Sequence, residues 1–262
     1  MYKISPWLLD LGIPISNMYI SMNPHPGAIQ FLQSNPQHIN WHTFSTNPSA
    51  IDIIRTNLDK ISIDMLTLNP EALDLILQYY PINWFWFSKN PAVFKSDFAK
   101  NEHKFINNLF TTQFIENTSP EAFEFMLRHK NIFSQSVYYQ MLSANPFAYK
   151  YMIRYEPYSI PHLNWFYLSE NHAAIGLLLS QPERIYWPAF CKNSSPDAIH
   201  LIKRNTDKIT PSIWQNPGIF ELDYQSMATQ RTAIILEELM IKTLHPSRIE
   251  YWLENGMSID DL

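Results

Sequence analysis

Residues able to do chemistry are few and scattered along this chain of 262 residues. His38 and His42 are four residues apart, a spacing that can bring two metal ligands together, but no third ligand follows. We interpret both as loop and surface residues. Cys191 is the only cysteine, so it forms no disulfide within the chain and belongs to no zinc-binding spacing. It occupies a position where similar segments carry serine, and we expect a small buried residue rather than a nucleophile.

Two pairs of adjacent carboxylates, Glu237-Glu238 and Asp260-Asp261, come nearest to an acid–base site. Neighbouring side chains on a helix point apart, so we interpret both pairs as solvated charges. The sequence also lacks the glycine-rich nucleotide loops, the serine-hydrolase elbow and the zinc-protease motif. We therefore expect no enzyme, with no catalytic residue, no cofactor and no metal.

Charge and composition narrow the classes of partner. The net charge is −5, and the longest basic cluster is the pair Lys203-Arg204, whereas nucleic-acid and membrane-surface binding favour a basic stripe. The longest apolar run, Ala173 to Leu179, is far too short to span a bilayer. Met1 to Ile15 lacks the pattern of a signal peptide. We expect a protein that is neither secreted nor transmembrane and that binds no nucleic acid.

The secondary-structure elements that must position these residues are predicted from an internal sequence repeat. Ile39 to Pro48, Ile82 to Pro91 and Leu163 to His172 align closely, and each is followed by an apolar box. The consensus is I-N-W-x-x-L-S-x-N-P-x-A-I-x-L-L-L. Weaker copies run over residues 15–24, 61–70, 137–146 and 185–196. The proline positions fall at residues 24, 48, 70, 91, 120, 146, 172 (where His replaces Pro), 196 and 217, with spacings of 21 to 29 residues.

Each unit should contain two short helices. Asn or Ser before Pro is typical of a helix start, because the side chain caps a free N–H and Pro suits the first helical position. A short helix of about two turns is expected over the I-N-W segment before it. Helices this short are marginal alone and must stack on neighbours. A leucine-rich repeat would need alternating strand residues, and an ordinary ankyrin repeat is about ten residues longer.

The fold prediction is therefore all-α: one curved solenoid of about nine short two-helix repeats, similar to a degenerate ankyrin array. We expect a single domain over residues 1–262, with an N-terminal cap at 1–14, repeats over 15–245 and a C-terminal capping unit at 246–262. Pro246 should open this last unit, and Gly256 should cap its helix.

The strings Asn57 to Ile61 and Asn205 to Ile209, together with the consensus, resemble the short Asn-Pro repeat proteins abundant in giant DNA viruses of amoebae. The resemblance covers roughly residues 15–256 and departs most between Phe94 and Thr118, where Ile106 to Leu109 lacks the Trp. It implies a viral interaction protein of the host cytoplasm or the virion. It supplies no catalytic residues.

The recurrent Trp41, Trp84, Trp165 and Trp187 are in register with the apolar stripe, which favours core packing. Phe85 and Trp86, like Phe166 and Tyr167, occupy variable positions of the inner segment, and such positions often line the binding face of a solenoid. We take these four as candidate partner-binding residues.

The function that we predict is a non-enzymatic scaffold for protein–protein interaction. The alternatives are a structural or virion-associated component that self-assembles, and a helical repeat protein that binds nucleic acid. The sequence leaves the partner, the oligomeric state and the binding face open.

Overall fold

The computed structural model describes residues 1–100, 102–243, 245–256 and 258. Within these residues nearly all regular structure is helical, and two short strands pair in a two-stranded sheet. The all-α prediction is confirmed.

The elements follow one another in short steps, with η denoting a 3-10 helix. The first part of the chain contains β1 (Tyr2–Ile4), α1 (Pro6–Asp10), α2 (Asn17–Met22), α3 (Pro26–Ser34), η1 (Pro36–His38), α4 (Trp41–Phe44), η2 (Pro48–Ala50), α5 (Ile51–Arg55), α6 (Ile63–Leu66), η3 (Pro70–Ala72), α7 (Leu73–Tyr79), α8 (Trp84–Phe87), η4 (Pro91–Lys95), α9 (Asp97–Lys100), α10 (Glu102–Asn108) and α11 (Thr111–Phe114). The second part contains α12 (Pro120–Arg128), η5 (Lys130–Ile132), α13 (Gln135–Ala144), α14 (Pro146–Tyr155), η6 (Pro157–His162), α15 (Trp165–Glu170), η7 (His172–Ala174), α16 (Ile175–Ser180), η8 (Pro182–Arg184), α17 (Trp187–Phe190), α18 (Pro196–Arg204), η9 (Thr206–Lys208), η10 (Pro211–Gln215), η11 (Pro217–Ile219), β2 (Phe220–Leu222), α19 (Tyr224–Thr243) and α20 (Pro246–Glu254).

Contacts divide the chain into two units, where the sequence predicted one domain. The larger unit is Ile4–Glu221, and the smaller combines Met1–Lys3 with Leu222–Leu262. The predicted repeats extended to residue 245, but Tyr224–Thr243 form one continuous helix of 20 residues. α20 begins at Pro246, as predicted, and Gly256 after it has a φ of +88°, the left-handed conformation expected of a C-terminal cap.

Nine buried asparagines, here called the asparagine belt, link successive segments of the larger unit. Each side-chain Oδ1 accepts the backbone N–H two residues further on, at 2.8–3.1 Å. Each Nδ2 donates to one or two backbone carbonyls of the preceding segment, at 2.8–3.3 Å. No side chain of the belt is more than 4% exposed. The belt consists of Asn23, Asn47, Asn69, Asn90, Asn117, Asn145, Asn171, Asn193 and Asn216.

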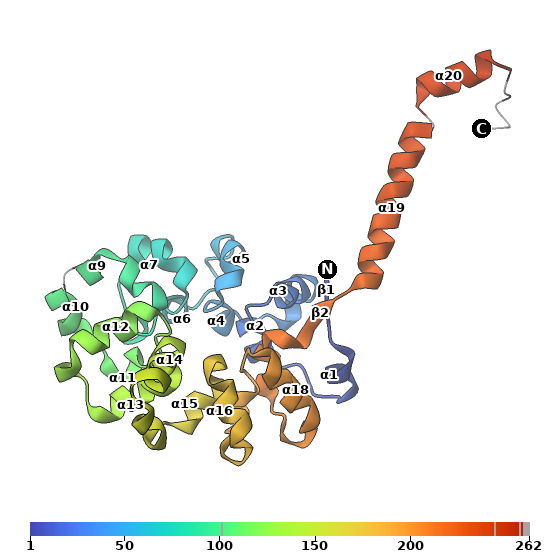
Figure 1. Ribbon diagram of the computed structural model, residues 1–262. Helices are drawn as coiled ribbons and strands as arrows, with labels where there is room; N and C mark the ends of the chain where they lie inside the picture. The colour runs from blue at the N-terminus through green and yellow to red at the C-terminus, as the bar shows by residue number, and fades with distance from the viewer. Residues whose placement is uncertain (101, 244, 257, 259–262) are drawn as a thin grey trace. The chain divides into compact units, whose positions relative to one another are not determined.

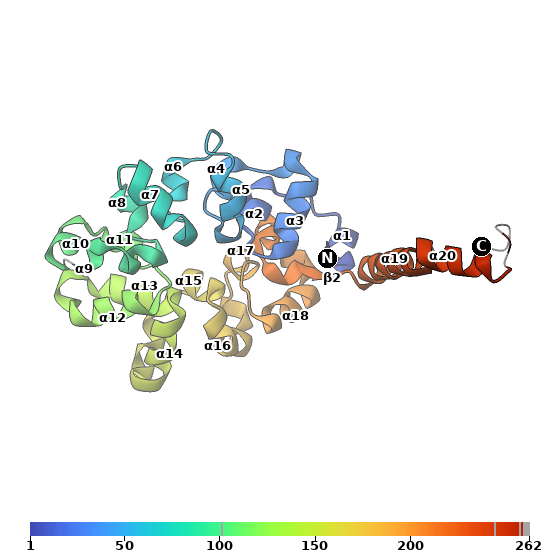
Figure 2. The same cartoon turned by 90° about the horizontal axis from the view of Figure 1, so that it is seen from above.

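The belt closes on itself. Asn23, the first member, donates to the carbonyls of Trp214 and Asn216 at 2.9 and 3.0 Å. The indole N–H of Trp214 also donates to the carbonyl of Pro14, at 2.8 Å. Within the larger unit the last helices thus return beside the first (Figures 1 and 2). An open curved solenoid would leave two free ends, whereas the small rotation between segments here accumulates to a full turn.

Helix starts largely follow the predicted capping chemistry. Asn47 caps its helix through Oδ1, with Pro48 at the first helical position. The register is different at two places, because the predicted anchors Pro120 and Pro196 follow serines. There the belt residues are Asn117 and Asn193, each three residues before the proline. The inner helices α4 and α8 are also shorter than the predicted two turns, with four residues each.

Serine hydroxyls form a second set of bridges between segments. Ser45 Oγ donates to the carbonyl of Trp41 at 2.7 Å and accepts the N–H of Ser62 at 3.0 Å. Ser88, Ser143 and Ser169 repeat this arrangement. Because the hydroxyl of Ser45 binds the carbonyl four residues earlier, it helps to end the one-turn inner helix before it.

The four recurrent tryptophans are half-buried and pack against the core, as predicted. Cations lie over the rings of three of them: Lys60 is 5.1 Å from the ring centroid of Trp41, Arg184 is 4.0 Å from that of Trp165, and Lys208 is 4.9 Å from that of Trp187.

The divergent stretch 94–118 forms part of η4, then α9, α10 and α11, with residue 101 outside the described residues. Phenylalanine rings fill the core here. Phe105 is fully buried, 6.1 Å from Trp84 and 5.1 Å from Phe125. A larger set of edge-to-face rings therefore replaces the missing Trp.

Candidate functional site: the central cavity

The residue immediately before each belt asparagine lines one cavity of about 610 Å³. Each belt side chain is directed to the preceding segment, and its neighbour along the chain is left at the cavity. We call these nine residues the cavity wall. They are Met22, Thr46, Leu68, Lys89, Glu116, Ala144, Glu170, Lys192 and Gln215.

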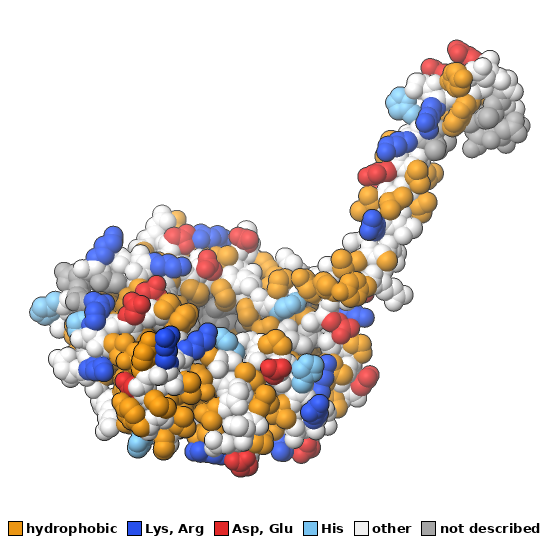
Figure 3. Space-filling model, in the orientation of Figure 1, with side chains coloured by type: hydrophobic (Ala, Val, Ile, Leu, Met, Phe, Trp, Pro, Cys, Tyr) orange, Lys and Arg blue, Asp and Glu red, His pale blue; other side chains and the backbone are white. Residues whose placement is uncertain are grey.

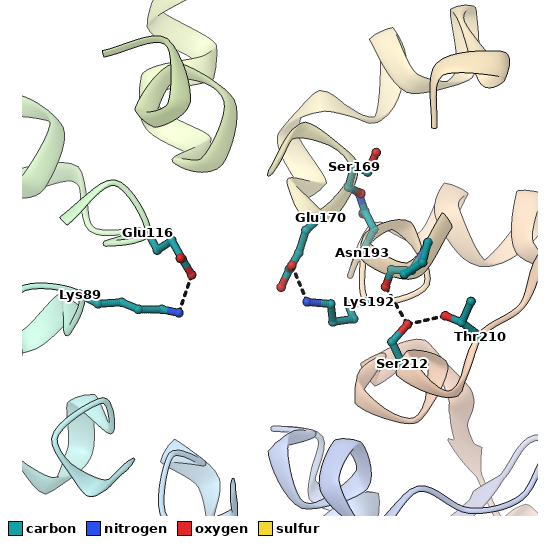
Figure 4. A network of polar contacts seen from close by, with 9 residues as sticks. Lys89, Glu116, Ser169, Glu170, Lys192, Asn193, Thr210 and Ser212 are labelled. Atoms are coloured by element: carbon teal, nitrogen blue, oxygen red, sulfur yellow. Dashed lines mark hydrogen bonds and ion pairs between the residues drawn. The ribbon is translucent and has the colours of Figure 1, made fainter. Parts of the chain in front are cut away.

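Two ion pairs join wall residues of successive segments. Lys89 pairs with Glu116, and Lys192 Nζ lies 2.7 Å from a carboxylate oxygen of Glu170. Figure 4 shows the two pairs on facing sides of the space between the surrounding helices. Ion pairs with this much solvent contact contribute about 0–1 kcal/mol to stability. Their main effect is the charge pattern, which gives the wall two ammonium groups and two carboxylates.

Two of the predicted partner-binding residues reach this cavity. Phe166 and Tyr167 both line it, and Phe166 is 47% exposed. Burial, together with the negative charge of Glu116, raises the pKa of the Tyr167 hydroxyl, which therefore stays protonated and able to donate.

The other two predicted residues, Phe85 and Trp86, are not among the residues that line the cavity. Phe85 is 37% exposed and packs edge-on against Trp86, with ring centroids 4.8 Å apart, and against Phe110 at 5.6 Å. Phe166 contacts Tyr186 in the equivalent way, at 5.2 Å. Each of the two variable positions thus forms an aromatic pair with the next segment, and only one of the pairs is at the cavity.

Sequence reasoning missed the nine wall residues. The signal was present in the consensus string S-x-N-P, where the Ser and Asn recur while the residue between them changes in size, polarity and charge. A fixed residue on each side of a varied one is typical of a framework that displays a variable surface. Spacing alone gave no reason to suppose that the nine varied residues meet.

The remaining candidates for chemistry are dispersed. His38 Nδ1 lies 2.8 Å from Asn17 Oδ1, and His42 is exposed on α4. Within the described residues no group of three or more His, Cys, Asp or Glu is arranged to hold a metal ion. Glu237 and Glu238 are exposed on α19. The pair at 260–261 lies outside the described residues.

Cys191 is fully buried, as expected, and burial raises the pKa of its thiol. The backbone and side chain of Thr210 and the side chain of Ser212 act in the opposite direction and lower the pKa of the thiol, but burial is the larger effect. Ser212 itself donates to the carbonyl of Pro188 at 2.6 Å. Cys191 therefore occupies the position of the bridging serines, two residues before Asn193, and burial keeps its thiol in the unreactive, protonated form.

None of the helices in the described ranges combines the length and the apolar character needed to cross a bilayer. No protein-family model matches the chain, and neither the curated proteins nor the solved structures contain a significant match to it.

Proposed function

We propose that the chain is a non-enzymatic interaction scaffold, a closed array of nine helical repeats that binds a segment of a partner protein at its central cavity. The observation that carries this proposal is the contrast within each segment. The belt position is Asn nine times, and the wall position beside it holds seven different residue types. Repeat proteins that bind partners combine a fixed framework with varied contact residues in this manner.

The chemistry of the cavity suits a polypeptide. Its volume is within the range of about 300–1,000 Å³ typical of ligand pockets. Its lining combines ammonium, carboxylate, amide and hydroxyl groups with the aromatic rings of Phe166 and Tyr167. A peptide that carries a basic, an acidic and an apolar side chain could place each of them against a complementary group of the cavity. Because the belt holds the wall residues on a rigid frame, little ordering entropy would be lost on binding.

The resemblance to the Asn-Pro repeat proteins of giant DNA viruses supports the same proposal, since the Asn of the motif is the belt residue. On that basis we propose that the protein acts in the host cytoplasm or the virion, with a host or viral protein as partner. The carboxylates of Glu116 and Glu170 in the cavity, and the net charge of −5, disfavour nucleic acid as a ligand.

Self-assembly is the second candidate, and one observation favours it. α19 exposes a series of large apolar side chains, and Figure 3 shows hydrophobic residues along much of this helix. Light scattering at several protein concentrations tests this candidate, because a self-assembling chain must gain mass as concentration rises. The exposed residues are Met227, Ile234, Ile235, Leu236, Leu239, Met240 and Ile241.

Selection of peptides from a displayed random library tests the preferred function. Peptides selected by the wild-type chain should lose affinity about tenfold or more for the variant Phe166→Ala, because an exposed aromatic side chain that lines the cavity is removed. Phe147→Ala is the matched control, since Phe147 is also 47% exposed but does not line the cavity. Equal losses with both variants, or no selectable peptide, would refute the proposal.

A further inference from the structure

A second cavity, of about 380 Å³, lies between α12, α13 and η6. Four aromatic residues contribute to its lining: Phe133, Tyr138, Tyr139 and Tyr158. It occurs where the belt asparagines are furthest apart, since 28 residues separate Asn117 from Asn145. The longer segment allows α13 ten residues, compared with four in α4 or α8.

The aromatic rings gather in one part of the cavity, here called the aromatic corner, and their faces are electron-rich. Tyr138 and Tyr139 have ring centroids 6.0 Å apart with their planes inclined at 57°. His162 stacks on Tyr139 at 4.7 Å and so fixes its orientation. The aromatic corner already attracts one cation, because Lys130, an exposed residue of the same lining, has its Nζ 5.5 Å from the centroid of Tyr138.

Two polar side chains of the lining, Ser159 and Glu156, could each bind a further group. Ser159 is only 1% exposed, and its hydroxyl oxygen is buried with no hydrogen-bond partner. Such a group is costly to leave unsatisfied. Glu156 is half-buried and accepts the Tyr138 hydroxyl at 2.8 Å, and no cation of the described residues is within ion-pair distance of it. A buried hydroxyl and an unneutralised carboxylate beside aromatic rings match an organic cation that also carries a hydroxyl.

We propose that this cavity binds a hydroxyalkyl trimethylammonium group. The methylated ammonium lies against the tyrosine rings and is neutralised by Glu156, and the hydroxyl pairs with Ser159. Lys130 occupies part of the aromatic surface when the ligand is absent. The site is independent of the central cavity, so its test stands apart from that of the scaffold function.

Calorimetric titration of the full chain with choline chloride, against a matched titration with sodium chloride, tests the proposal. Choline should bind at a single saturable site. Its neutral isostere 3,3-dimethylbutan-1-ol should bind at least about tenfold more weakly, because it has the same shape without the charge. Equal affinity for the two molecules, or no saturable binding of choline in the millimolar range, would overturn the proposal.

Variants locate the site. Glu156→Gln keeps an acceptor for Tyr138 but removes the charge, and it should weaken choline binding about tenfold. Lys130→Met removes the competing cation and should strengthen binding severalfold. Tyr155→Ala is the control, because Tyr155 is 57% exposed and does not line the cavity. Loss of binding in Tyr155→Ala equal to that in Glu156→Gln would contradict the assignment.

The trimethylammonium group occurs in free choline, which carries the hydroxyl, and in phosphatidylcholine headgroups, where the same oxygen is esterified to phosphate and can only accept a hydrogen bond from Ser159. Co-sedimentation with phosphatidylcholine vesicles, compared with phosphatidylglycerol vesicles, distinguishes these sources. Selective binding to the former that choline competes away identifies the headgroup, and binding of free choline alone identifies the soluble molecule.

Discussion

The asparagine belt and the cavity wall are adjacent along the chain in every segment, but they are built on opposite rules. The belt uses one residue nine times, with every side chain at most 4% exposed and hydrogen-bonded on both sides. The wall uses seven residue types and includes charged groups that contact solvent. The comparison indicates that structure depends on the belt, whereas under the proposed function recognition depends on the wall, so changes at the two positions should have separate effects.

The largest expected effect is on the belt. Asn69→Leu removes two bonds from Nδ2, to the carbonyls of Ser45 and Asn47, and one from the N–H of Glu71 to Oδ1. Since the abandoned groups stay buried, the free energy of unfolding should fall by about 3–5 kcal/mol. Urea denaturation measures the loss. The adjacent wall variant Leu68→Thr should lose less than half as much, and equal losses would abolish the distinction between the two positions.

Closure of the ring gives the next effect. Asn23→Leu breaks the bonds to the carbonyls of Trp214 and Asn216, and it should lower the free energy of unfolding by about 2–4 kcal/mol. In an open array the same residue would face solvent at one end, and its replacement would cost well under 1 kcal/mol. Urea denaturation of this variant beside Asn69→Leu therefore decides whether the belt is continuous.

Cys191 offers a third test of the comparison. It is buried, as the belt residues are, although it stands one residue before the wall residue Lys192. Burial raises the pKa of its thiol in the folded chain. The unfolded thiol ionises at about pH 8.5, so this contribution to stability is fully present below that pH and is lost as the pH rises towards the folded pKa. Relative to Cys191→Ser, the wild type should lose stability above about pH 8.5 and not below it. A flat difference from pH 7 to pH 10 would show that the thiol is not buried.

The smallest effect should come from the wall itself. Lys192→Met removes the ion pair with Glu170, whose side chain is 44% exposed, and should change the free energy of unfolding by about 0–1 kcal/mol. Thermal denaturation at low and high salt measures it. A destabilisation as large as that of Asn69→Leu would mean that the wall is structural.

The local features of the fold could be predicted from the sequence because each of them depends on only a few neighbouring residues. The cap of Asn47, the start of α20 at Pro246 and the burial of Cys191 depend on immediate neighbours. The hydrogen bonds from each Nδ2 to the preceding segment depend on how far apart successive segments lie in space. The spacing of residues along the sequence does not contain that distance. The same limit explains why the belt residues Asn117 and Asn193 were missed. α12 and α18 begin at Pro120 and Pro196, as predicted, but the belt asparagine lies three residues before each proline.

The contact between Asn23 and Trp214 could not be predicted from the sequence either, because it sums small rotations over a sequence separation of 191 residues. Phe166 was singled out because its residue type stands out at a variable position, but nothing in the pattern separated it from Phe85, which does not line the cavity. The ion pairs of the wall were missed because their members are 22 and 27 residues apart.

A belt without ends also fixes the number of segments. Open helical arrays change length readily, since a unit can be duplicated or deleted wherever two units meet. Here the removal of one segment would leave Asn23 too far from the carbonyl of Trp214 unless every remaining angle opened in concert. Such a chain should diversify by substitution at its wall positions and not by gain or loss of copies.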